Sequence, residues 1–147
     1  MALESELVVP VLINALHDAD QEVRYNAAFG VGGTAYMGGD ARMAIPALIE
    51  TLNDSYRTAR AAAATALGFI HGEPGLAVPA LIKALHDPEM AVRACVADAL
   101  ARFGTDAKPA AGALVKLFTN GNQDEKAAAS KALKAIDPEA AAKAGVK

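Results

Sequence analysis

Apolar residues recur along the chain with the spacing of amphipathic helices, and the pattern occurs four times. The segments VPVLINALHDADQEVRYNAAFGVGG, IPALIETLNDSYRTARAAAATALGF, VPALIKALHDPEMAVRACVADALAR and AGALVKLFTNGNQDEKAAASKALKA begin at Val9, Ile45, Val78 and Ala111. Their offsets are 36, 33 and 33 residues, and a period of this length is typical of helical solenoids. Each segment predicts two helices, called A and B below, joined by a short polar turn.

The first half of each segment predicts the A helix. Leu12 and Leu16 lie four residues apart, which is the spacing of one helical face, and apolar residues occupy the same two positions in every repeat. Pro10, Pro46 and Pro79 fall near the predicted start of an A helix, where a missing N–H group costs least.

The second half of each segment predicts the B helix. In the third repeat, Asp87 is expected to be the N-cap residue, because it is followed by a first-turn proline, Pro88. The same position is occupied in the other repeats by Asp18, Asp54 and Asn120. The B helices are expected to end near Gly72 and Gly104, which suit a helix C-terminus.

A helix pair of this length has apolar residues on more than one side, so it must stack on its neighbours to bury them. The abundant alanines let helices approach closely while keeping a high helix propensity. The predicted fold is therefore an all-α solenoid of about four helix pairs in a single domain, residues 1–147. The expected repeats are about 7–42, 43–75, 76–108 and 109–137, followed by a tail at 138–147. The first junction, 36–44, carries three extra residues and predicts a longer, mobile loop.

Composition excludes several classes of protein. The 147 residues include one cysteine, 14 Lys and Arg and 17 Asp and Glu, so the net charge is −3. A single cysteine cannot form an internal disulfide, and no apolar run reaches the length of a membrane span, so we expect a soluble cytoplasmic protein. The lysines near the C-terminus alternate with carboxylates, which argues against binding of nucleic acid.

The pattern VPALIKALHDPEMAVRACVADALARFG resembles the short HEAT-like repeat of the phycobilin lyase family and of many bacterial HEAT-repeat proteins. The resemblance covers residues 7–137. It implies a right-handed superhelix whose B helices line a concave, partner-binding side. It also implies that Asp18, Asp54 and Asp87 cap helices, while a ladder between neighbouring repeats is made by Arg24, Arg60 and Arg93.

No catalytic or metal-binding pattern stands out. Gly30, Gly32 and Ala35 match a dinucleotide-binding spacing, but they end a predicted helix instead of following a strand. HEAT-like deoxyhypusine hydroxylases bind iron through His-Glu pairs in their B helices. The corresponding pairs here are Tyr25-Asn26, Ala61-Ala62, Ala94-Cys95 and Ala127-Ala128. These pairs cannot supply such ligands, so the sequence favours a non-enzymatic protein without a cofactor or metal.

A partner-binding surface is expected on the B helices. The residues predicted to form it are Tyr25, Asn26, Phe29, Phe69, Asp98 and Arg102. An aromatic cluster with a charged border is typical of an interaction hot spot. The alternative is that Phe29 and Phe69 only pack between repeats.

The favoured hypothesis is a non-catalytic scaffold that binds another protein on its concave face. The alternative is a phycobilin-lyase-like subunit or ligand-binding module whose groove holds a tetrapyrrole or its carrier protein. The N-terminal helix adds a further expectation, because Leu3, Leu7, Val8 and Val11 are apolar with nothing upstream to cover them. This helix could mediate a homodimer or contact another subunit, or the chain could be cut from a longer repeat array.

Overall fold

The computed structural model describes residues 2–147, with side chains described from Glu4 onward. This part of the chain is all helical, which confirms the predicted α-solenoid fold. The A helices are α1 (Ala2–Ala15), α3 (Ile45–Thr51), α5 (Pro74–Ala84) and α7 (Ala111–Asn120). The B helices are α2 (Gln21–Tyr36), α4 (Arg57–Ile70), α6 (Met90–Arg102) and α8 (Gln123–Ile136). Two 3₁₀ helices, η1 (Arg42–Ala44) and η2 (Gly104–Ala110), precede α3 and α7, and α9 (Pro138–Lys143) follows α8.

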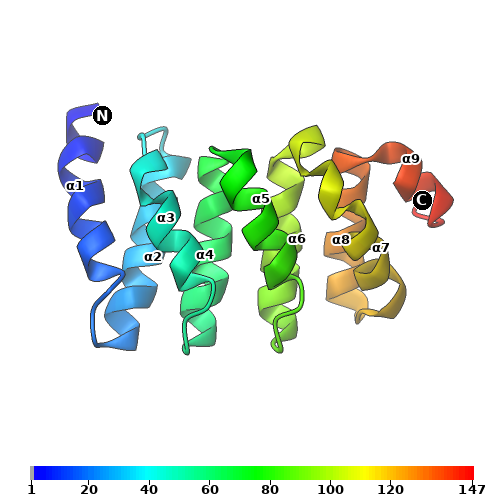
Figure 1. Cartoon of the computed structure of the whole chain (residues 1–147), viewed down its shortest axis with the longest axis horizontal. Helices are drawn as coiled ribbons and strands as arrows, with labels where there is room; N and C mark the ends of the chain where they lie inside the picture. Colours follow the sequence, from blue (N-terminus) through cyan, green and yellow to red (C-terminus); the bar gives the residue numbers. More distant parts are fainter. Residues whose placement is uncertain (1) are drawn as a thin grey trace.

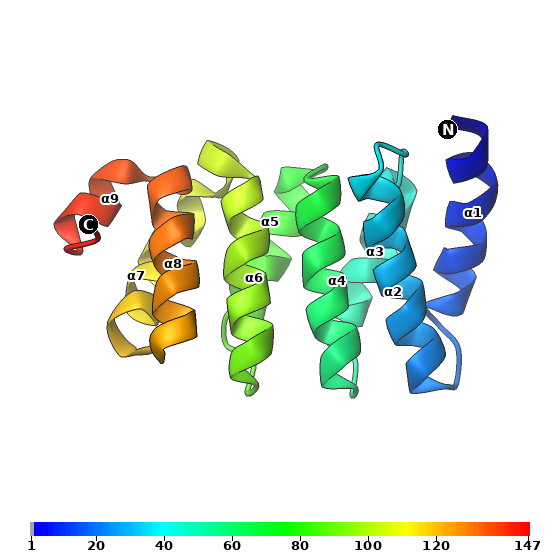
Figure 2. The same cartoon turned by 180° about the vertical axis from the view of Figure 1, so that it is seen from behind.

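The helix pairs stack in one row from the N-terminus to the C-terminus (Figure 1). Seen from behind, the four B helices stand side by side as one layer (Figure 2). Each B helix packs extensively on the next, whereas the A helices touch one another little. The B helices therefore form the more tightly spaced layer of the solenoid.

Small residues set the close spacing of the B helices. Gly32 of α2 faces the backbone of Ala66 in α4, and a Cβ atom added at Gly32 would lie 3.3 Å from the Ala66 Cα. Gly68 of α4 faces Ala99 of α6 in the same way, at 2.8 Å. Side chains without bulk let two helix backbones approach closely, so glycine and alanine at these positions create the B-helix layer.

The prediction that Asp18, Asp54 and Asp87 are the N-caps is wrong by two residues. The observed N-cap residues of α2, α4 and α6 are Asp20, Tyr56 and Glu89. Each of the three aspartates instead accepts the backbone N–H two residues later, at 2.8–2.9 Å. This short-range bond forms an Asx turn ahead of the helix. In the fourth repeat, Asn120 ends α7 and Asn122 is the N-cap, with a full capping box.

Two other boundary predictions are corrected. Pro10 and Pro79 lie inside α1 and α5, because these helices begin earlier than predicted, while Pro46 lies in the first turn of α3. At the end of α4, His71 takes the left-handed conformation (φ 34°) in place of Gly72.

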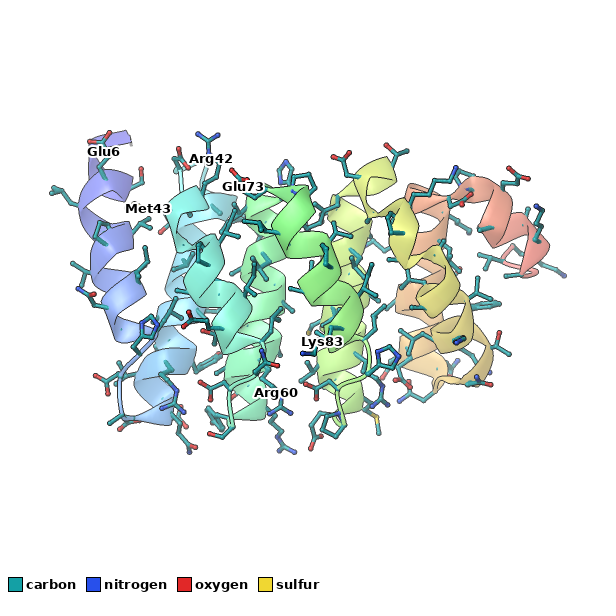
Figure 3. All side chains as sticks on the ribbon, viewed as in Figure 1. Glu6, Arg42, Met43, Arg60, Glu73 and Lys83 are labelled. Atoms are coloured by element: carbon teal, nitrogen blue, oxygen red, sulfur yellow. The ribbon has the colours of Figure 1, made fainter. Side chains whose placement is uncertain are left out.

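A ladder of charged hydrogen bonds joins the repeats at the end of the molecule where the A–B turns lie, the position of Arg60 in Figure 3. Arg24 donates two bonds to Asp54, at 2.6 and 3.0 Å. Arg60 donates two to Asp87, at 2.7 and 3.0 Å. Each of these arginines also donates to backbone carbonyls of its own A–B turn. The side chains are largely buried, and these two rungs tie α2 and α4 to the repeats that follow them.

The last rung of the ladder uses a different acid. Arg93 donates to Glu125 of α8, since the aspartate position of the fourth repeat is Asn120. Glu125 is buried and also accepts the Asn122 backbone N–H. Burial alone would raise the pKa of Glu125, but the bonds from Arg93 and from Asn122 outweigh it and lower the pKa. The Arg24 guanidinium likewise lowers the pKa of Asp54.

Because the pKa values of Asp54 and Glu125 are lowered, the stability of the fold is expected to decrease at acidic pH. A carboxyl group whose pKa is lower in the folded chain stabilises the fold above its unfolded pKa, and that contribution is lost as the pH falls through the folded value. We therefore expect thermal stability to be constant above about pH 5 and to fall steeply below about pH 4. Thermal melts from pH 7 to pH 3 test this, and Asp54→Asn should lose less stability over this range than the wild type. An equal loss in both proteins would contradict the role of Asp54.

Candidate partner-binding groove

An apolar groove of about 440 Å³ runs between α2 and α4 on the B-helix face. Its floor consists of small residues, and aromatic side chains form its walls. The lining residues, called the aromatic groove below, are Tyr25, Ala28, Phe29, Gly32, Gly33, Tyr36, Thr58, Ala61, Ala62, Thr65, Ala66 and Phe69. None of these side chains carries a charge.

The aromatic side chains along the groove contact one another in pairs. On α2, the rings of Tyr25 and Phe29 are 6.2 Å apart. At the other end of the groove, Tyr36 meets Phe69 of α4 edge to face, with ring centroids 5.2 Å apart. At this same end, the guanidinium of Arg102, from α6, lies over the Phe69 ring, 4.4 Å from its centroid. Three successive B helices thus contribute to one end of the groove.

The six residues predicted to bind a partner divide into two groups. Tyr25, Phe29 and Phe69 line the groove, and Arg102 borders it. Asn26 is exposed on α2 outside the lining, and Asp98 lies on α6 within 3.9 Å of Lys131. Phe29 is 66% exposed, so most of its ring is outside the packing between repeats.

Tyr36 is the aromatic side chain in the groove lining that was not predicted from the sequence. It was assigned to the loop of the first junction, but α2 continues through the glycines to Tyr36, which is 72% exposed. The helical spacing contained the signal, since residues 25, 29 and 36 lie four and then seven positions apart. After Tyr36 the chain turns at Gly38 and enters η1, so the junction is shorter than predicted.

Cys95 is half-buried near Thr65, and its pKa is raised because burial disfavours the thiolate. A raised pKa makes a thiol a poor nucleophile. Among the described residues, no group of three or more His, Cys, Asp or Glu side chains could hold a metal ion. Within residues 2–147 no helix combines the length and hydrophobicity of a membrane span.

Comparisons with known proteins agree with this architecture. The sequence profile described as HEAT repeats matches residues 9–77 and 45–134. A solved structure titled as the complex of CpcE and CpcF of phycocyanin lyase, from Nostoc sp. PCC7120, is similar at 30% identity with a TM-score of 0.75. That match covers 88% of this chain and 53% of the other, so this chain spans about half the length of that relative.

Engineered proteins share the fold as well. Two of them are 24% and 21% identical to this chain, with TM-scores of 0.73 and 0.77. The matches cover 93% and 94% of this chain, and 68% and 69% of the engineered chains. Comparison with curated protein sequences gives no significant match. Because the HEAT-repeat profile matches most of the chain, from residue 9 to residue 134, the chain belongs to the HEAT-repeat family.

Proposed function

We propose that this protein is a non-catalytic scaffold that binds another protein in the aromatic groove. The observation that carries the proposal is the exposure of Phe29 and Tyr36 on either side of an uncharged groove. Contiguous exposed apolar surface is uncommon on a soluble chain and marks interaction sites. Aromatic side chains supply much of the binding energy at such sites because they remove a large area from water.

Charged side chains next to the groove would orient the partner. Arg102 is an exposed residue, and its guanidinium stacks on the Phe69 ring. Such a cation favours a carboxylate of the partner near the Tyr36 end of the groove. Asn26 and Asp98 provide polar groups farther from the lining. The proposed partner therefore inserts apolar side chains between α2 and α4 and places an acidic group near Arg102.

Substitution of Tyr25 and Phe29 by Ser tests the proposal. The double variant should lose about tenfold or more in partner recovery from a lysate of the source organism, since truncation of central aromatic residues weakens binding strongly. Circular dichroism should show unchanged helicity, because Phe29 contributes little to packing. Leu76→Ser is the matched control, since Leu76 is an exposed apolar residue outside the groove.

The outcomes separate the hypotheses. Equal recovery by the wild type and the double variant would refute a role for the groove. A loss of helicity in the double variant would show that Tyr25 and Phe29 pack between repeats, which is the alternative interpretation of these residues.

The similarity to the phycocyanin lyase structure supports a second candidate function. In this alternative, the groove holds a tetrapyrrole or its carrier protein, with the propionates of the pigment near Arg102. Arg57 is the other cation considered for this role, but it lies 3.8 Å from Glu89. Titration with a bilin distinguishes the candidates: a shift in absorbance that is lost in Phe29→Ser supports the ligand-binding alternative, and an unchanged spectrum supports the protein scaffold.

A further inference from the structure

The aromatic groove lies between two α-helices, so its walls offer few free hydrogen-bonding groups. Except in the terminal turns, the backbone N–H and C=O groups of α2 and α4 are paired within each helix. The Thr65 hydroxyl donates to the Ala61 carbonyl at 3.0 Å, and the Thr58 hydroxyl is buried. The hydroxyl groups of Tyr25 and Tyr36 are the other polar side-chain groups of the lining. The middle of the groove therefore offers apolar contact and almost no partner for a hydrogen bond.

This surface disfavours a bound segment in an extended conformation. The groove follows α2 from Tyr25 to Tyr36, a length of about 16 Å at the helical rise per residue. An extended segment of this length would place the backbone N–H and C=O groups of about five residues against the apolar lining. Backbone groups that leave water without gaining a partner are strongly unfavourable. A helix pairs these groups within itself and presents only side chains to the groove.

The groove is open because of the direction in which Phe29 points, whatever lies beside α1 and α2. Thr65 and Asp98 occupy the same repeat position as Phe29. Thr65 is part of the groove lining, and the Asp98 side chain is 54% exposed although α6 packs on a B helix at each side. This repeat position therefore stays accessible between neighbouring repeats, and a further helix pair next to α1 and α2 would leave Phe29 accessible too.

The two ends of the groove differ in charge. At one end, the guanidinium of Arg102 lies over the Phe69 ring. At the other end, Glu22 accepts the Tyr56 hydroxyl at 2.7 Å, which links the first turn of α2 to the N-cap of α4. The cation that follows on α4, Arg57, already lies 3.8 Å from a carboxylate of α6. Opposite charges at the two ends favour one orientation of a charged ligand.

We propose that the segment bound in the aromatic groove is an amphipathic α-helix of the partner protein, about three turns long. Its apolar residues, spaced at i, i+4, i+7 and i+11, fill the space between α2 and α4. Its acidic end lies at Arg102. This inference rests on the proposed function, because it names the kind of partner segment that the groove accepts.

Two displayed peptide libraries test the conformation of the occupant. Both contain peptides of about 14 residues with randomised apolar positions and with Glu, Lys or Gln at either end. In the first library, the apolar positions have the helical spacing in a framework of alanine and glutamine. In the second library, they alternate with polar residues, and prolines prevent helix formation. Each library is selected on the wild type and on Phe29→Ser, with Leu76→Ser as the control for exposed apolar surface outside the groove.

We expect the helical library to be enriched at least about tenfold on the wild type relative to Phe29→Ser, with acidic residues at one end of the enriched peptides. Arg102→Glu should change this preference to basic residues at that end. An unchanged preference would overturn the orientation at Arg102.

Proline substitution in an enriched peptide tests the helix directly. Proline at a central, solvent-facing position should weaken binding at least about tenfold, whereas glutamine at the same position should not. Proline breaks the helix there without removing a contact with the groove, so equal affinities of the two peptides would overturn the helical conformation.

The outcomes separate the conformation of the occupant from the proposed function. Enrichment of the extended library would overturn the helix while leaving the groove as a binding site, and enrichment of neither library would also overturn the helix. The proposed function fails separately, if partner recovery from the lysate is equal for the wild type and the Tyr25 and Phe29 double variant. A homodimer in sedimentation that Phe29→Ser dissociates would assign the groove to a second copy and overturn the choice of a partner protein.

Discussion

Replacement of Arg60 by Gln is expected to lower the free energy of unfolding by about 3 kcal/mol. The guanidinium makes two bonds to Asp87 and a third, at 2.9 Å, to the Asp54 carbonyl. The Asp87 side chain is only 6% exposed, so removal of the arginine leaves its charge poorly solvated. Urea denaturation of the two proteins at pH 7 measures the difference.

Arg57→Gln provides the control on the same helix. Arg57 is an exposed residue whose guanidinium lies 3.8 Å from Glu89, and exposed pairs of this kind contribute less than about 1 kcal/mol. The double variant Arg60→Gln with Asp87→Asn should recover part of the stability lost in Arg60→Gln, since it removes the uncompensated charge and keeps an acceptor for the turn. Equal destabilisation by Arg57→Gln and Arg60→Gln would show that the ladder does not act as a buried network.

The repeat pattern predicted the fold because every level of the sequence supports it. Apolar residues recur with helical spacing, and alanines mark the close contacts between helices. Profile and structural similarity then confirm the HEAT-repeat family and the α-solenoid. The prediction that Asp18, Asp54 and Asp87 are N-cap residues was nevertheless wrong. An aspartate that precedes a helix can be the N-cap itself, or it can lie two residues before the N-cap and form an Asx turn. The ladder arginines bind aspartates of the second kind.

The aromatic groove and the arginine ladder were each predicted only in part, because one residue of each depends on three-dimensional packing. Tyr36 was assigned to the loop of the first junction because Gly38 and Gly39 follow it, but α2 continues to Tyr36 and packs on α4. Glu125 was not predicted as a rung, since it lies on α8 itself, five residues after the aspartate position. Tertiary contacts override local propensity in the first case. In the second case, a longer side chain reaches Arg93 from a different position.

Substitution of Gly68 by Val is the other change with a large expected effect, a loss of about 3 kcal/mol of unfolding free energy. A Cβ atom at this position would lie 2.8 Å from the Ala99 Cα and 3.0 Å from its Cβ. The obstacle is backbone, which cannot rotate away as a flexible side chain can. The spacing of α4 and α6 would have to increase, and the Arg60 to Asp87 rung spans the same junction.

Gly33→Val is the matched control for the close contact between α4 and α6. Gly33 is also a helical glycine of the B layer, but a Cβ atom there would meet nothing within 4 Å. Valine has a higher helix propensity than glycine, so Gly33→Val should leave stability unchanged or raise it by a few tenths of a kcal/mol. Opposite signs for the two variants in thermal melts would show that close approach of the B helices, and not helix propensity, decides the effect. A similar loss in both would mean that the B layer has no specific requirement for glycine at position 68.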